Sequence, residues 1–480
     1  MRRRGQGCMV LAATLLNGAL AGCTVGPNFH QPAPPQVSAY RSGGDTPRSA
    51  DSSAPLLDPA AKVDFDWWRA FRSPALDALV ARAIAQNPQV EGAQQRLRAA
   101  QAQLRAGYGA FFPAVGVSFD AARQKYSPSK VGQSGAGSVY SLFTPSIAIS
   151  YALDIFGGNR RAVEGLRAQT EQQQQITRAT YLTLASTVAS TAIARAEFHE
   201  QAEAQAAIVA AQAIQLHLAE VRVKAGTDSY ATQLALQAQL EASRSVLSEI
   251  RQKAEQADSL LAILLGDPPA AARLPDIKLA DLHLPETLPL RLPSTLVRQR
   301  PDILAAEAAA HAASAQIGVA TAGMLPDITL SAGMGSSANA FGKLFSAGSG
   351  VWSYGAAATA PVFEGGTLLN RRVAAKASAQ AALADYRQTV LQSFAQVADT
   401  LSAIDQDSDA AGAQQRADDA AHTAYQLVDA NYQAGRASDA DLLASDTQAR
   451  QARIALLASQ AARLQDCVAL FAALGGGWWP

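Results

Sequence analysis

Histidine is scarce in this chain, with six residues among 480. None of the six stands at a spacing typical of metal ligands, and the sequence has no nucleophile motif and no phosphate-binding glycine loop. We therefore expect no enzymatic activity, no metal and no diffusible cofactor. The histidines, which we interpret as residues on solvated helix faces, are His30, His199, His217, His283, His311 and His422.

Net charge and long apolar runs are absent as well. The 40 basic and 40 acidic residues balance, so there is no basic excess that would attract nucleic acid. No stretch beyond the N-terminal segment has eighteen uninterrupted apolar residues, and we expect no membrane-spanning helix. Contact with a membrane would then have to be made through a β-barrel or a lipid anchor.

Aromatic residues make up only 6% of the chain, although 49% of it is hydrophobic. Alanine, leucine and valine supply most of the hydrophobic fraction, interspersed with glutamine, arginine and glutamate. Most of these residues are good helix formers, and alanine allows helices to pack closely. The composition is typical of long helix bundles rather than of a bulky globular core.

The first residues have the layout of a lipoprotein signal peptide. Three arginines precede a short apolar stretch, and a Leu-Ala-Gly-Cys sequence follows that ends at Cys23. We predict a signal peptide over residues 1–22 and covalent lipid on Cys23, as S-diacylglycerol and N-palmitoyl groups. The alternative is a signal peptide without lipid and an incidental cysteine. Thr24, rather than an aspartate, follows the cysteine, which favours release to the outer membrane.

The processed chain has no disulfide framework. Of three cysteines, Cys8 would leave with the signal peptide and Cys23 would be acylated, which leaves Cys467 alone. The signal peptide also contains three arginines. Their loss would leave 37 basic residues (40 − 3) against 40 acidic ones, so the processed chain would be mildly acidic. An exported protein of this kind has to be stabilised by packing or by assembly.

Residues 87–266 and 300–474 have the same construction, because dipeptides that mark element boundaries recur at nearly the same separation. The matching dipeptides are Asn87-Pro88 with Arg300-Pro301, Phe112-Pro113 with Leu325-Pro326, and Ala225-Gly226 with Ala434-Gly435. A period of about two hundred residues is too long for a solenoid unit and indicates a single duplication. The chain divides into a signal peptide (1–22), a lipidated N-terminal tether (23–66), a first repeat (67–266), a proline-rich connector (267–299) and a second repeat (300–480).

Each repeat contains two segments of alternating pattern. In the first segment Val115, Val117 and Phe119 point to one side, while glycine, serine and aspartate point to the other. One apolar face and one small polar face are typical of a strand between a wet space and an apolar one. Segments of about ten residues also have the length of tilted transmembrane strands. The predicted strands span about 113–124, 144–154, 326–336 and 351–362.

Two interpretations of these strands stay open at this point. One is a soluble antiparallel sheet packed on helices. If the strands enter a membrane instead, four of them cannot close a barrel, and lipid tolerates no open sheet edge. Several chains would then have to contribute strands to one barrel.

A very long helix follows each strand pair, over about 159–224 and 369–433, and neither range contains proline. Roughly 65 residues at 1.5 Å each extend about 100 Å. A helix of this length and composition has to lie along neighbouring helices to be stable. Each one ends at a glycine, Gly226 or Gly435, and reverses into a second helix.

Several local motifs accompany this duplicated order of strands and helices. They are Cys23-Thr24-Val25-Gly26-Pro27-Asn28-Phe29 with Pro32, Trp67-Trp68, Phe71, Leu76 to Leu79, Asn87-Pro88 and the terminal Ala473-Leu474-Gly475-Gly476-Gly477-Trp478. With these motifs the chain resembles the TolC-type outer-membrane efflux proteins, in particular the NodT-like lipoprotein branch that serves resistance–nodulation–division pumps. The resemblance covers essentially the whole chain.

The resemblance implies a mainly α-helical fold with a transmembrane β part. Three chains would form a homotrimer with a twelve-stranded β-barrel in the outer membrane of a Gram-negative bacterium, continuous with a helical tunnel through the periplasm. The implied function is passive, gated export of small molecules as the exit duct of a tripartite efflux pump. The implied partners are a periplasmic adaptor (membrane fusion) protein, an inner-membrane transporter and outer-membrane lipid, without nucleic acid. Alternatives are a duct for type I protein secretion and a non-conducting coiled-coil lipoprotein.

The resemblance also implies a gate at the periplasmic helix reversals. Tyr432 matches a tyrosine of the closed-state contacts, and Asp441 matches a position in an inward-facing acidic ring. The family aspartate directly after the Leu-Leu pair is missing here, where Ala444 stands. Asp439 and Asp441 would replace it: three chains would place six of these carboxylates near one axis, where repulsion raises some of their pKa values and cations are attracted. The other interpretation, which is compatible with the first, is that both are N-terminal acids that stabilise the dipole of the returning helix. Two further gate candidates are Asp228, at the first reversal, and Asp446.

Overall fold

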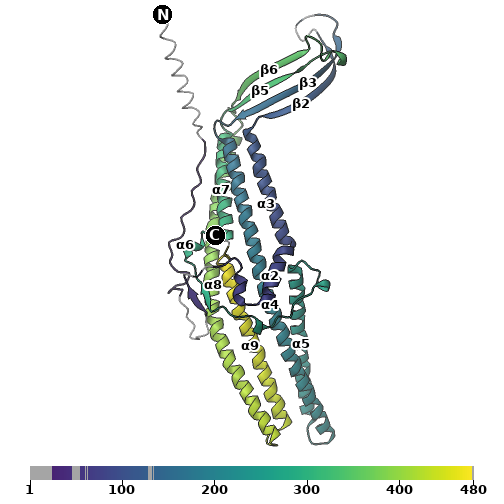
Figure 1. Cartoon of the computed structure of the whole chain (residues 1–480), viewed down its shortest axis with the longest axis vertical. Coiled ribbons are helices and arrows are strands. Elements are labelled where there is room, and N and C mark those ends of the chain that lie inside the picture. Colours follow the sequence, from purple (N-terminus) through teal and green to yellow (C-terminus); the bar gives the residue numbers. More distant parts are fainter. Residues whose placement is uncertain are drawn as a thin grey trace. The chain divides into compact units, whose positions relative to one another are not determined.

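The computed structural model describes residues 24–45, 55–59, 61, 63–127, 132 and 134–477. The predicted signal peptide and Cys23 lie outside these residues. The chain forms long helices and a four-stranded sheet (Figure 1). The helices are α2 (Pro74–Gln86), α3 (Pro88–Gly107), α4 (Gly158–Lys224), α5 (Tyr230–Leu264), α6 (Pro293–Leu296), α7 (Pro301–Ala322), α8 (Thr367–Gln433) and α9 (Asp439–Ala473). The strands are β1 (Leu56–Asp58), β2 (Ala114–Tyr126), β3 (Ser138–Leu153), β4 (Thr287–Pro289), β5 (Asp327–Ser336) and β6 (Gly350–Thr359).

Two strand boundaries differ from the sequence-based expectation. β3 begins at Ser138 rather than near residue 144, because its first residues continue the ladder opposite β2, with Ser138 paired to Tyr126. β6 ends at Thr359 rather than at 362. Pro361 explains the early end, since proline has no N–H to donate to a ladder.

The chain divides into two compact units. Among the described residues, unit 1 falls in the ranges 24–32, 97–173 and 306–386, and unit 2 in the ranges 33–96, 174–305 and 387–477. Each unit takes segments from both sequence repeats, so the duplication did not produce two separate domains. The reason in unit 1 is that the strand pairs of both repeats join in a single sheet.

The sheet of unit 1 is antiparallel in the order β2-β3-β5-β6, and the β3–β5 ladder joins the two repeats. One cross-strand row on its apolar face consists of Val117, Ile147, Met334 and Trp352. Val117 is 80% exposed and Trp352 is 75% exposed. Helices therefore do not cover this face, in contrast to the soluble sheet that the sequence left open.

Unit 2 contains a large apolar core around a short 3₁₀ helix, η1 (Trp67–Phe71). Trp67 stacks on Phe471 of α9 with ring centroids 5.2 Å apart, and Phe71 is fully buried. Leu76 of α2 and Ile193 of α4 belong to the same core and are also fully buried. The Trp-Trp and Phe motifs are thus core residues, which explains part of the motif pattern by packing.

Three helices are long and apolar enough to cross a membrane by length and composition alone. They are α4, α7 and α9, each with an 18-residue window of mean hydropathy 1.2. The expectation of no membrane-spanning helix was based on unbroken apolar runs, whereas alanine-rich windows reach this hydropathy with small polar residues among them.

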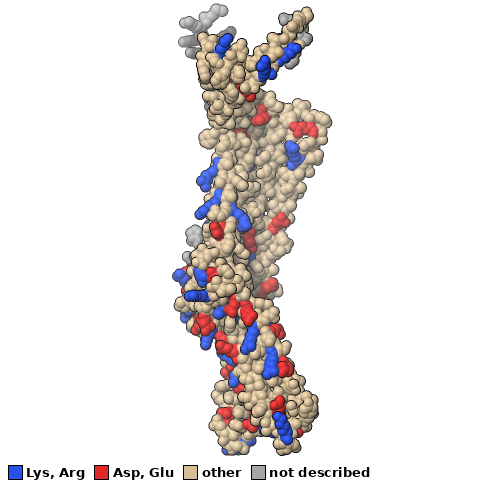
Figure 2. Space-filling view, turned by 90° about the vertical axis from the view of Figure 1, so that its right-hand side faces the viewer, with Lys and Arg blue, Asp and Glu red and all other residues tan. Residues whose placement is uncertain are grey.

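Acidic and basic side chains are interspersed over the helical surface of unit 2 on the face that Figure 2 shows. This distribution agrees with the equal numbers of acidic and basic residues in the sequence. No large field of one sign is therefore visible on this helical face.

Candidate functional site

The two helix reversals of unit 2 share one backbone design. Gly226 and Gly435 have positive φ angles of 75° and 71°, a conformation that side chains rarely adopt. In both reversals the amide that follows the glycine donates to a carbonyl of the preceding helical turn, at 2.9 and 2.8 Å. Ser229 and Ser438 then cap the returning helices α5 and α9. These hydrogen bonds satisfy backbone N–H and C=O groups at the helix ends that lack partners within the helix, and they fix the conformation of each reversal.

Asp439 connects the two reversals. The Tyr432 hydroxyl donates a 2.7 Å hydrogen bond to Oδ1 of Asp439. The other carboxylate oxygen, Oδ2, lies 3.6 Å from Nη2 of Arg222, in the last turn of α4. The pKa of Tyr432 is raised, because its hydroxyl is hydrogen-bonded to Asp439 and its ionisation would place a second negative charge there. One carboxylate therefore contacts the ends of both α4 and α8.

Asp441 has a different role within one chain. It forms a capping box with Ser438, whose N–H and Oγ donate to Oδ2 of Asp441 at 3.0 and 2.7 Å. The hydroxyl oxygen of Ser438 in turn accepts the Asp441 N–H at 3.2 Å. These bonds lower the pKa of Asp441, the side-chain bond from Ser438 first. The pKa falls within one chain because these hydrogen bonds favour the charged form of the carboxyl group.

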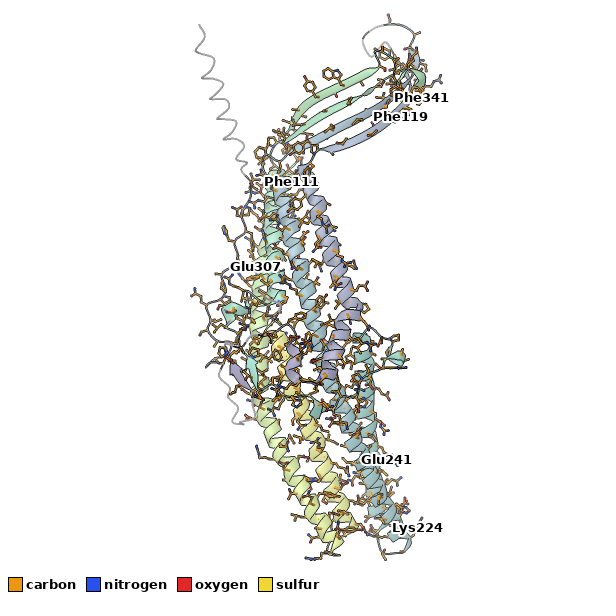
Figure 3. All side chains as sticks on the ribbon, in the orientation of Figure 1. Phe111, Phe119, Lys224, Glu241, Glu307 and Phe341 are labelled. Atoms are coloured by element: carbon orange, nitrogen blue, oxygen red, sulfur yellow. The ribbon has the colours of Figure 1, made fainter. Side chains whose placement is uncertain are left out.

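The two weaker candidates engage local partners. The Asp228 carboxylate accepts the N–H of Ser229 at 2.7 Å, at the start of α5. Asp446 accepts Nε of Arg450, one turn further along α9, at 2.8 Å. Sequence reasoning missed Arg222, although a basic residue in the last helical turn was visible. Such residues are ordinarily explained by the helix dipole, so the pattern alone does not indicate a contact with Asp439. Lys224, at the end of α4, marks this part of unit 2 in Figure 3.

The segment that follows Cys23 is bound to the helices of unit 1. Arg161 of α4 is only 4% exposed and donates to the Val25 carbonyl at 3.1 Å and to Oδ1 of Asn28 at 2.8 Å. Its remaining charge is met by Glu164 at 2.7 Å. The buried guanidinium of Arg161 thus binds the extended segment after Cys23 through several directed hydrogen bonds. This part of the predicted N-terminal tether (23–66) is therefore docked on unit 1.

Glycines allow the close approach of this segment. Gly26 has a φ of 92°, and a Cβ on it would lie 2.5 Å from the Cα of Gly318 in α7. Phe29 stacks on His311 of α7 with ring centroids 4.5 Å apart, and His311 Nε2 lies 3.0 Å from Glu164. His311 is therefore a packing residue, which corrects its interpretation as a residue on a solvated helix face.

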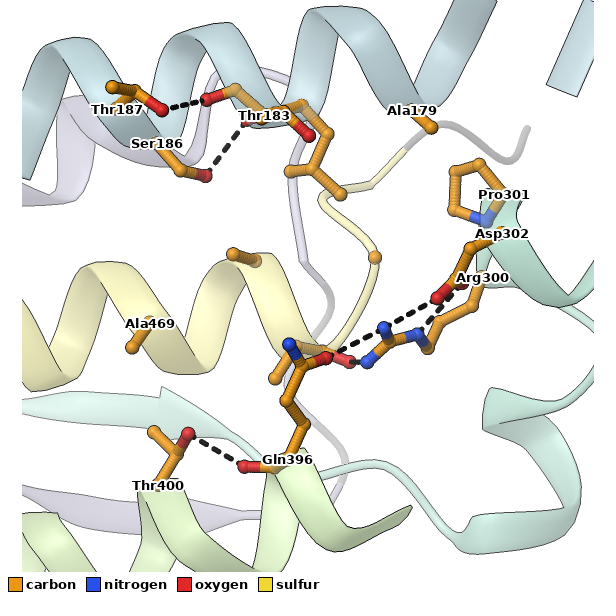
Figure 4. A pocket seen from close by; sticks show the side chains of 14 residues that line it. Ala179, Thr183, Ser186, Thr187, Arg300, Pro301, Asp302, Gln396, Thr400 and Ala469 are labelled. Atoms are coloured by element: carbon orange, nitrogen blue, oxygen red, sulfur yellow. Dashed lines mark hydrogen bonds and ion pairs between the residues drawn. The ribbon is translucent and has the colours of Figure 1, made fainter. Parts of the chain in front are cut away.

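A pocket of about 440 Å³ lies beside the start of α7 and the end of α9 in unit 2 (Figure 4). Arg300 donates there to Asp302, to Gln396 at 2.8 Å and to the Ala473 carbonyl at 2.6 Å. Three hydroxyls of the lining donate to carbonyls one turn earlier in their own helices. The pairs are Ser186 with Leu182, Thr187 with Thr183, and Thr400 with Gln396. The guanidinium of Arg300 and these three hydroxyls are thus engaged within the chain, and Arg300 fastens the end of α9.

Among the residues that the structure describes, no cluster of three or more His, Cys, Asp or Glu side chains could hold a metal ion. What the geometry does provide is a sheet with an uncovered apolar face, paired long helices and two fastened reversals. A fold with these parts defines the class of TolC-like outer-membrane channels.

The comparisons with known proteins agree. The model of the family described as outer membrane efflux protein matches residues 79–267 and 292–476. The pyoverdine export outer membrane protein OpmQ of Pseudomonas aeruginosa is 34% identical over 423 residues, 86% of this chain and 87% of OpmQ. The probable efflux pump outer membrane protein TtgC of Pseudomonas putida is 29% identical over 475 residues, 96% of this chain and 94% of TtgC.

Solved structures show the same architecture. The outer-membrane channel OprN has a TM-score of 0.83 and 26% identity, with 95% of this chain and 100% of that one covered. The open state of the MtrE outer membrane channel of Neisseria gonorrhoeae has a TM-score of 0.80 and 26% identity, covering 95% and 98%. This chain belongs to the outer membrane efflux protein family. It is an outer-membrane efflux channel of the TolC-like fold, in a family of transport proteins.

Proposed function

We propose that this chain is a homotrimeric exit duct, which docks a periplasmic adaptor protein and an inner-membrane transporter of the resistance–nodulation–division type. Three copies of the four-stranded sheet close a twelve-stranded barrel, and the helices form the periplasmic tunnel. Transport through the duct is passive, because the transporter supplies the energy. Its cargo is a small molecule, as the names of relatives such as a pyoverdine export protein and a toluene efflux pump protein suggest.

The observation that supports the trimer most directly is the exposed sheet. β2 and β6 form its edges, and both are exposed along their whole length in one chain. Lipid cannot satisfy the N–H and C=O groups of an open edge, so a sheet with this apolar face has to close with further strands. Copies of the same chain supply such edge strands, β2 with 13 residues and β6 with 10 residues.

Covalent lipid on Cys23 is part of the proposal. Docking of Val25 and Phe29 on α4 and α7 supports it, because a segment that follows Cys23 closely in the sequence is fixed on unit 1. The anchor and the strands would then enter the same membrane. Mass spectrometry of the N-terminal peptide should show the diacylglyceryl and palmitoyl groups, and a Cys23→Ser variant should lack both.

The gate is proposed at the reversals. Tyr432 and Asp439, with Arg222, hold the tips in a closed state, while Asp441 caps α9 and adds negative charge beside them. Asp228 and Asp446 are secondary positions. In the trimer, Asp439 and Asp441 from three chains would form the acidic constriction that selects cations. An Asp439→Ala/Asp441→Ala variant should lose cation preference and block by multivalent cations, and unchanged values for both would refute the constriction.

The experiment that tests the duct itself uses the full-length protein purified in detergent. We expect a mass of three chains, heat-sensitive migration of the trimer on gels, and ion conductance after insertion into planar bilayers. A stable monomer, or a trimer that does not conduct in any state, would contradict the proposal. A conducting trimer would also exclude a purely structural coiled-coil lipoprotein.

A further inference from the structure

The loop between β5 and β6 folds back over the sheet of unit 1. Residues 337–349 include a short 3₁₀ helix, η6 (Phe341–Lys343), and Phe143 and Ala338 pin the loop to β3 with two backbone hydrogen bonds of 2.9 and 3.1 Å. The hydroxyls of Ser336 and Ser349 donate to the Leu344 carbonyl. The loop is therefore a built structure, and Leu344 is only 3% exposed.

This loop lies over one end of the apolar face of the sheet, not over its small polar face. Phe341 packs edge-on against Phe119 and Phe143, with ring centroids 6.3 and 6.0 Å apart, and Figure 3 shows Phe341 beside Phe119. Phe119 shares its side of β2 with Val117, two residues away in a strand with regular pairing. In the proposed barrel this side faces lipid.

The fold-back leaves an apolar pocket of about 540 Å³ on this face. Its lining includes Val117, Ile147 and Met334 from the strands, with Leu344 and Phe345 from the loop. Phe345 is 95% exposed, so it lines the pocket at its rim and is not packed against the rest of the protein. The volume lies in the range of sites that bind small ligands, and the walls suit a hydrocarbon chain.

Basic side chains stand at the loop end of the same face. Lys343 directly precedes Leu344 of the pocket, and Arg123 and Lys125 lie further along β2 on the side of Phe119. Asp120 points to the opposite side of that strand, because side chains alternate. Figure 2 shows basic side chains at this end of the sheet. An anionic group above a hydrocarbon chain would therefore meet opposite charge.

We propose that this pocket binds one acyl chain of a phosphorylated glycolipid of the outer leaflet, with a glycolipid phosphate at Lys343 and Arg123. The outer leaflet follows from the topology, because the loop lies at the end of the strands opposite their junctions with the helices, which extend into the periplasm. The inference rests on the proposed barrel, since only a lipid-facing sheet presents this face to acyl chains.

Native mass spectrometry of the purified trimer, titrated with diphosphoryl hexa-acyl lipid A, tests the proposal. A Lys343→Gln/Phe345→Ser variant should retain severalfold less lipid A than the unaltered trimer. The matched control is Arg371→Gln/Phe363→Ser, which removes one exposed cation and one aromatic residue that is 87% exposed, both outside the pocket. The control should bind as the unaltered protein does.

Two further measurements separate the outcomes. Monophosphoryl lipid A should bind more weakly than the diphosphoryl form to the unaltered trimer, and phosphatidylglycerol should not replace it. Equal retention by the pocket variant and the control, or equal binding of phosphatidylglycerol, would overturn the glycolipid site while trimer mass and conductance stay intact. Loss of the trimer or of conductance in the unaltered protein would instead refute the proposed duct.

Discussion

The hydroxyl of Tyr432, at the end of one long helix, is hydrogen-bonded at 2.7 Å to Asp439, at the start of the next. Asp439 also lies 3.6 Å from Arg222 of the other long helix. The contact closes a reversal and joins it to the second reversal of the chain. A single charged side chain therefore carries both links, which makes its loss more disruptive than the loss of either partner.

Opening of the tips should follow removal of this carboxylate. We expect Asp439→Asn to raise the mean single-channel conductance in planar bilayers, and Tyr432→Phe to raise it less, because the phenylalanine variant leaves the Arg222 pair intact. Glu241→Gln is the matched control, since it also removes one exposed negative charge and its partner Arg244 is on the same helix. An equal increase in the control would assign the effect to general loss of negative charge.

The capping box predicts a pH dependence at the start of α9. The pKa of Asp441 is lowered in the folded chain, so its stabilising effect is present above the unfolded pKa and is lost as pH falls through the folded value. Asp441→Asn should speed amide hydrogen exchange in the first turn of α9 at pH 7. The rate ratio of variant to unaltered protein should approach one below the folded pKa. A ratio that does not change with pH would show that the charge of Asp441 is irrelevant there.

The elements that sequence could predict are those with a local physical cause. The alternation of apolar and small polar residues predicted the positions of the strands. The absence of proline from 159–224 and 369–433 predicted the two long helices, which end before Gly226 and Gly435. The capping relation of Ser438 and Asp441 was also within reach, because it depends on a spacing of three residues.

Contacts between distant segments could not be predicted in the same way. Arg161 is one of many arginines in the helices, and its burial depends on where residues 25–28 fold back. The fold-back of residues 337–349 is hidden in a stretch that is rich in glycine and serine, where no periodicity indicates a face. In both cases the partner comes from another element, so only the assembled unit reveals it.

Arg300 predicts a contrast between a buried arginine and an exposed one. Arg300→Gln should lower the unfolding temperature and cost about 1–2 kcal/mol, mainly because the Ala473 carbonyl loses a donor whose side chain is only 9% exposed, whereas Asp302 is 41% exposed and is solvated in part. Arg244→Gln breaks a 2.7 Å pair with Glu241 in which both side chains are more than half exposed, and should change stability by no more than about 0.5 kcal/mol. Differential scanning fluorimetry in detergent measures both. Similar shifts would refute the fastening role of Arg300.

The docked N-terminal segment offers a test that separates backbone strain from packing. Gly26 and Gly44 have nearly the same φ, 92° and 94°, so an alanine at either position adds similar backbone strain. A Cβ at Gly26 would also lie 2.5 Å from the Cα of Gly318, whereas a Cβ at Gly44 meets no atom within 4 Å. Gly26→Ala should therefore release residues 24–31 to limited proteolysis, while Gly44→Ala leaves their cleavage unchanged. If both variants are cleaved alike, strain alone explains the result, and close packing against α7 does not hold the segment.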